Sequence, residues 1–144
     1  MKLLLVGSGG REHALALKLM EGATPVELFA APGSDAIGEL GTCLPFQAED
    51  LDGISAWCAV NRPDLLVIGP EGPMVAGLGD AVRALGIPVF GHDAATARLE
   101  GSKAFAKEFM VRHRIPCAAS LTVSDLEKGS AEIRAWAHGY PLVL

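Results

Sequence analysis

Short apolar runs alternate with stretches of helical periodicity along most of this chain. The runs at residues 3–6 and 65–68 are apolar at every position. Strands without polar alternation are typical of parallel sheets that helices cover on both faces. The pattern therefore predicts an α/β fold built on an open, doubly wound parallel sheet. The expected strands occupy residues 3–6, 26–30, 65–68, 89–90, 121–123 and 142–144.

Between these runs the apolar positions recur at helical spacing. In residues 50–61 this spacing turns Leu51, Ile54 and Cys58 inward, together with Trp57. Helices of this kind lie between parallel strands and cover the sheet. The expected helices occupy residues 14–20, 50–61, 74–85 and 102–114.

The character of the sequence changes after Pro116. We therefore expect a second domain to begin near Cys117, which divides the chain into domains 1–118 and 119–144. Residues 142–144 are apolar and have no polar tail after them. Because an unpaired apolar strand is a poor end for a domain, we expect the chain to be part of a longer protein.

Composition excludes several classes of protein. The 144 residues carry a net charge of −5 with mixed signs, which does not suit a nucleic-acid partner. The three cysteines have no metal-binding spacing, so we expect reduced thiols and assign no metal ligand. No apolar run is long enough for a membrane span, and the first run is too short for a secretory signal. We expect a cytoplasmic protein without a membrane partner.

The first candidate site is the sequence Gly7-Ser8-Gly9-Gly10-Arg11-Glu12, which joins a predicted strand to a predicted helix. Such a turn presents unpaired backbone N–H groups and the positive helix end, which suit a phosphate. Arg11 opposes the helix dipole unless an anion binds nearby. Glu12 stands where a dinucleotide fingerprint needs a small residue, which argues against NAD. Glu12 is either a helix N-terminal carboxylate or a group that receives ribose hydroxyls or an amine.

Two further segments are ambiguous from spacing alone. Glu71 follows the run at 65–68 and lies either in a rigid turn or at the same sheet edge as Arg11, where it could bind a sugar hydroxyl or an amine. Lys103 follows Gly101 and Ser102, but the glycine that a Walker motif requires is absent. Its spacing indicates only a solvated basic face.

Taken together, these motifs closely resemble the glycinamide ribonucleotide synthetases, which are phosphoribosylamine-glycine ligases. The resemblance lies in the segments 7–15, 31–33, 67–73 and 99–105 and runs in register along nearly the whole chain. It implies a Rossmann-like domain followed by the start of an ATP-grasp module. It also implies a ligase of purine biosynthesis that joins glycine to 5-phosphoribosylamine with ATP and Mg²⁺.

The resemblance assigns roles to individual residues. Gly9, Gly10 and Arg11 would hold the phosphoribosyl substrate, and Glu12 and Glu71 would receive its hydroxyls or its amine. The resemblance also raises Lys103 from a surface cation to a group that approaches the ATP phosphates. Since such a reaction needs no protein nucleophile, we assign no catalytic residue in this chain.

The sequence departs from the family pattern at two places. Ser34 stands where asparagine is usual, and His92-Asp93 replaces a common proline in the segment before Leu99. Two alternatives remain: a nicotinamide-dependent Rossmann oxidoreductase and a non-catalytic nucleotide-binding module. The first is disfavoured because the run at 26–30 is not followed by an acidic residue that could bind the ribose. We expect the 144-residue chain alone to be inactive as a ligase.

Overall fold

The computed structural model describes residues 1–136 and residue 141. It divides into two compact units, Met1–Gly101 and Ser102–Leu144. Within the described residues, no helix is both long and apolar enough to cross a membrane. The three cysteines are free thiols, as predicted.

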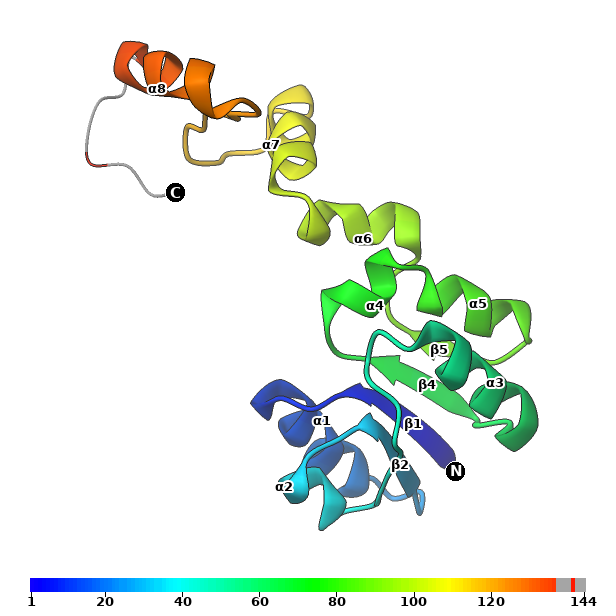
Figure 1. The fold of residues 1–144 in the computed structure, drawn as a ribbon. Helices are drawn as coiled ribbons and strands as arrows, with labels where there is room; N and C mark the ends of the chain where they lie inside the picture. Colours follow the sequence, from blue (N-terminus) through cyan, green and yellow to red (C-terminus); the bar gives the residue numbers. More distant parts are fainter. Residues whose placement is uncertain (137–140, 142–144) are drawn as a thin grey trace. The chain divides into compact units, whose positions relative to one another are not determined.

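The first unit is built on a parallel sheet with the strand order β3-β2-β1-β4-β5. Figure 1 labels four of these strands, β1, β2, β4 and β5. The α/β fold with an open parallel sheet is confirmed. The four strands predicted before residue 100 are present, whereas β3 was not predicted because it has two exposed residues and no apolar run. The strands are β1 (Lys2–Gly7), β2 (Glu27–Pro32), β3 (Thr42–Cys43), β4 (Leu65–Ile68) and β5 (Val89–Phe90).

The central strand β1 is buried on both faces and supplies two separate apolar clusters. Leu4 and Val6 point into the cluster beneath the later helices, and Leu3 and Leu5 point into the cluster on the opposite face. All four side chains have no exposed surface, which explains why their run lacks polar alternation. The sheet is therefore the middle of three layers.

Helices cover both faces of this sheet, as the sequence predicts (Figure 1). The helices α1 and α2 pack on the Leu3 face through Ala16 and Ile37, and the helices α3 to α6 contribute to the cluster on the Leu4 face. The helices are α1 (Gly10–Met20), α2 (Asp35–Gly38), α3 (Leu51–Asn61), α4 (Glu71–Val75), α5 (Leu78–Ala84) and α6 (Ala94–Gly101).

The single helix predicted over 74–85 is wrong, because the chain forms two helices there. Gly77 adopts a φ of 97°, which is left-handed and interrupts the helical hydrogen bonding between α4 and α5. In α3 the predicted inward face is present: Ile54 and Cys58 have no exposed surface. Burial raises the pKa of the Cys58 thiol to about 11, so this thiol stays protonated near neutral pH.

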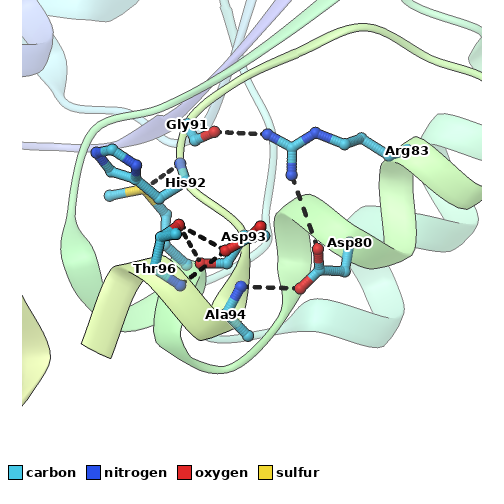
Figure 2. A network of polar contacts seen from close by, with 8 residues as sticks. Asp80, Arg83, Gly91, His92, Asp93, Ala94 and Thr96 are labelled. Carbon is cyan, nitrogen blue, oxygen red and sulfur yellow. Dashed lines mark hydrogen bonds and ion pairs between the residues drawn. The ribbon is translucent and has the colours of Figure 1, made fainter. Parts of the chain in front are cut away.

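The segment containing His92 and Asp93 forms an ordered start to α6 (Figure 2). The Asp93 carboxylate accepts a hydrogen bond from the Thr96 hydroxyl at 2.5 Å and one from the Thr96 N–H at 2.7 Å. From α5, Asp80 accepts the Ala94 N–H at 2.9 Å, and Arg83 donates to the carbonyl of Gly91. Hydrogen bonds from α5 to Gly91 and Ala94 thus hold the segment that contains His92 and Asp93 against α5.

This network has a pH dependence that can be measured. Hydrogen bonds from the Thr96 hydroxyl and N–H hold the pKa of Asp93 below its ordinary value. A depressed folded pKa contributes stability that is present above the unfolded value of about 4 and is lost as the pH falls through the folded value. Asp93→Asn keeps a capping acceptor without the charge. We therefore expect the stability advantage of wild type over Asp93→Asn to shrink as the pH falls below the unfolded value of about 4, measured by urea unfolding. Thr96→Val should reduce this pH dependence; an advantage independent of pH contradicts the interpretation.

The second unit contains α7 (Lys103–Arg112) and α8 (Leu126–Ala135). Each begins with a side-chain cap, since Ser102 accepts the Phe105 N–H and Asp125 accepts the N–H groups of Glu127 and Lys128. The strand predicted at 121–123 is wrong: these residues pair with no other strand in the described part of the chain, and an apolar run forms a strand only against a partner. The strand predicted at 142–144 lies outside the described residues.

Candidate functional site

A pocket of about 190 Å³ opens at the edge of the sheet where the parallel strands end. Ligands on doubly wound sheets bind at this edge, at the point where the strand order reverses direction. In this sheet the order reverses at β1, since β2 and β3 lie on one side of it and β4 and β5 on the other. The last residues of β1 and β2 and the segments that follow β1, β3 and β4 all contribute to the pocket. Its lining residues are Gly7, Ser8, Gly9, Glu12, Pro32, Gln47, Ala48, Glu49 and Pro70.

The turn from β1 to α1 forms one wall of the pocket. Gly7 has a φ of 125°, which lets the chain leave the strand sharply. The first hydrogen bond of α1 runs from the His13 N–H to the Gly9 carbonyl, so the amides of Gly10 and Arg11 precede the helical hydrogen-bond ladder. Both residues are exposed. The predicted bend therefore presents backbone donors at its surface.

Arg11 lies on the first turn of α1 and is exposed. No hydrogen bond or ion pair joins its guanidinium to another described residue. A cation at this helix end opposes the helix dipole, and α1 also has no side-chain cap because Gly9 precedes it. A bound anion would compensate both features.

Glu12 is the buried member of the turn, with 4% of its surface exposed. Its Oε2 accepts the Gly9 N–H at 2.7 Å, and its Oε1 is buried without a hydrogen-bond partner among the described residues. The first of the two interpretations, a carboxylate at the helix N-terminus, matches this geometry. A direct contact of Glu12 with substrate stays a prediction.

The other predicted residues lie in different places. Glu71 is exposed at the start of α4, just beyond β4. Because β4 is parallel to β1, Glu71 and Arg11 both come after strands that end at the same edge of the sheet. Neither Gly10, Arg11 nor Glu71 lines the pocket itself. Lys103 is exposed at the start of α7, in the second unit.

Sequence reasoning missed Gln47 and Glu49, which line the pocket from the loop between β3 and α3. Both are exposed, and both carry groups that accept hydrogen bonds from hydroxyls or amines. Only the recognition of β3 would have placed this loop at the sheet edge, and β3 has no sequence signal. The pocket thus has polar acceptors from the β3–α3 loop in its lining, and the exposed Gly10 and Arg11 of the β1–α1 turn follow its lining residues Gly7 to Gly9 in the chain.

The fold and this turn define a doubly wound α/β domain with an exposed, glycine-rich bend at the end of its central strand. The family model described as "Phosphoribosylglycinamide synthetase, N domain" matches residues 1–100. The chain belongs to this family.

Curated relatives and a solved structure agree with this assignment. The chain is 44% identical over its whole length to phosphoribosylamine–glycine ligase of Rhizobium meliloti (strain 1021), of which it covers 34%. It is 43% identical over 138 residues to the trifunctional purine biosynthetic protein adenosine-3 of Chironomus tentans, covering 92% of this chain and 10% of that protein. The crystal structure of phosphoribosylamine–glycine ligase from Thermotoga maritima superimposes with a TM-score of 0.70 at 25% identity, covering 95% of this chain and 31% of that one.

A biotin carboxylase domain of a single-chain bacterial carboxylase shares the fold, with a TM-score of 0.65 at 14% identity; the match covers 94% of this chain and 34% of that one. The chain spans about a third of the length of the phosphoribosylamine–glycine ligases that it matches.

Proposed function

We propose that this chain is the N-terminal part of a phosphoribosylamine–glycine ligase of purine biosynthesis. The reaction joins glycine to 5-phosphoribosylamine, which gives glycinamide ribonucleotide, and converts ATP to ADP and phosphate. One observation carries the proposal: a chain of this family exposes the Gly9-Gly10-Arg11 bend beside a pocket at the sheet edge, and the Arg11 guanidinium has no partner among the described residues. This bend suits the phosphate of the phosphoribosyl substrate.

The chemistry of such a ligase proceeds in two balanced steps. ATP transfers its terminal phosphoryl group to the glycine carboxylate, which gives an acyl phosphate and ADP. The amine of 5-phosphoribosylamine then attacks the acyl carbon, forms the amide bond, loses a proton and releases phosphate. In both steps the protein's task is mainly to position reactants and to offset negative charge.

In this proposal the residues of the chain hold the amine-bearing substrate. The backbone bend of Gly9 and Gly10 and the guanidinium of Arg11 hold its phosphate; the Gly9 amide donates to Glu12, so the donors offered to the phosphate are the amides of Gly10 and Arg11. Glu71, which is exposed, receives ribose hydroxyls or the amine. Glu12 shares that task only if its side chain leaves the Gly9 amide.

The family resemblance adds further parts to this proposal. ATP and Mg²⁺ are the cofactors, the cytoplasm is the location, and Lys103 lies near the ATP phosphates. The chain divides into domains 1–118 and 119–144. The described residues contain no group of three or more His, Cys, Asp or Glu side chains that could hold a metal ion. We therefore propose no Mg²⁺ ligand among the described residues.

The nicotinamide-dependent alternative has no support in the geometry. The strand β2 ends in Ala31 and Pro32, so no carboxylate stands there to bind a ribose. Glu12 fills the space that a dinucleotide fingerprint leaves to a small residue. Tight binding of NAD in a titration would revive this alternative.

A chimera tests the proposed activity. This chain replaces the segment of the Rhizobium meliloti ligase to which it is similar. We expect the chimera to form glycinamide ribonucleotide only when ATP, glycine and 5-phosphoribosylamine are all present, with the product detected by mass spectrometry. The 144-residue chain alone should release no phosphate above the blank, because it spans a third of such enzymes. A folded chimera that binds ribose 5-phosphate but forms no product contradicts the proposal, as does product formation by the chain alone.

A further inference from the structure

The unexplained feature of the site is the position of Glu12. A carboxylate with 4% exposure and one buried oxygen without a partner is costly, because Oε1 loses water and gains no hydrogen bond in return. A helix N-terminal carboxylate that served the helix alone could remain in solvent at no such cost. The burial therefore indicates a second task.

Three glycines surround this side chain. A methyl group at Gly7 would lie 2.6 Å from the Cγ of Glu12, and one at Gly9 would lie 2.9 Å from its Oε2. A methyl group at Gly69 would overlap Oε1 and lie 2.6 Å from Cγ. Gly7 and Gly9 belong to the β1–α1 turn, and Gly69 follows β4. The carboxylate thus fills the space between the turns that follow two neighbouring strands.

We propose that Glu12 is a positioning residue that braces the β1–α1 turn against the β4–α4 turn and holds the Gly9 amide inward. With that amide occupied by Oε2, the amides of Gly10 and Arg11 are left to the ligand. Glu12 then acts on phosphate through the backbone and does not touch the ribose. The functional half of this inference rests on the proposed phosphate site; the bracing half does not.

A double-mutant cycle tests the bracing. Gly69 has no left-handed φ, so an alanine there is opposed by its contacts and not by its backbone. We expect Gly69→Ala to lower the urea midpoint of unfolding in wild type and to have little effect in the Glu12→Ala background. Additive effects of the two substitutions overturn the inference. If Glu12→Ala does not fold, Glu12→Asp withdraws the carboxylate by one carbon and replaces it in the cycle.

Ligand binding separates positioning from direct contact. Glu12→Gln keeps the shape of the side chain and weakens its bond to the Gly9 N–H, since a neutral acceptor replaces a charged one. We expect its affinities for inorganic phosphate and for ribose 5-phosphate to fall by the same factor, about threefold to tenfold. The amide proton of Gly9 should move upfield in the NMR spectrum of the free chain.

Each outcome decides one question. Loss of ribose 5-phosphate affinity with unchanged phosphate affinity shows that Glu12 contacts the sugar, which overturns the positioning role. An unshifted Gly9 amide proton also overturns it. If wild type binds neither probe, the phosphate site and the functional half of the inference fail, whereas coupling between Glu12 and Gly69 would still establish the bracing.

Discussion

Gly7→Ala is expected to lose about 3 kcal/mol of folding stability or more, because two independent costs meet at this position. The φ of 125° is strained for any residue with a Cβ, which costs on the order of 1–3 kcal/mol. The new methyl group would also lie 2.6 Å from Cγ and 2.8 Å from Cδ of Glu12, and 3.1 Å from Cδ of Pro70. Overpacking of this kind adds about 1–3 kcal/mol. Urea unfolding followed by circular dichroism measures the loss.

Gly86→Ala is the matched control for Gly7→Ala. Gly86 also has a left-handed φ, of 76°, but an added methyl group would meet nothing within 4 Å. It should therefore show the backbone cost alone, about 1 kcal/mol. Equal losses for the two variants would mean that Glu12 does not fill the space beside Gly7.

Gly10→Ala is expected to leave folding intact and to weaken ribose 5-phosphate binding at least tenfold. Gly10 has no left-handed φ, and an added methyl group would meet nothing within 4 Å, so the fold does not require glycine there. Alanine is in fact the better helix former. In the proposed phosphate site, glycine at this position lets the ligand approach the backbone closely. Tenfold corresponds to about 1.4 kcal/mol of binding free energy.

Isothermal calorimetry and urea unfolding on the same samples separate the two effects of Gly10→Ala. The control is Gly22→Ala, which lies after the far end of α1, at the opposite end of the helix from the bend. It should leave the affinity within about twofold of wild type. A Gly10→Ala variant that binds ribose 5-phosphate as tightly as wild type removes Gly10 from the proposed phosphate site.

The fold was predictable where the pattern of apolar residues is strong. The runs at 3–6 and 65–68 identify β1 and β4 because both strands are buried on both faces. The strand β3 is two exposed residues long and carries no such pattern. The break at Gly77 within 74–85 depends on one backbone angle, which a helical apolar pattern does not reveal.

The site was predictable only in part for a related reason. The bend at Gly9 and Gly10 has a local signature, since glycines join a strand to a helix. The burial of Glu12 has none, because it depends on Gly69, which only the parallel pairing of β1 with β4 brings close. Gln47 and Glu49 reach the pocket from the loop after β3, so they were hidden together with that strand.

The brevity of the two outermost strands bears on how the first unit behaves at high concentration. β3 and β5 have two residues each, so the rims of the sheet offer few unpaired backbone groups to a strand from another molecule. Long, flat edge strands are the usual template for aggregation, and short edge strands give another chain few backbone groups to pair with. The apolar strands most prone to self-association, β1 and β4, lie in the interior of the sheet, where each is paired with a neighbouring strand on both sides.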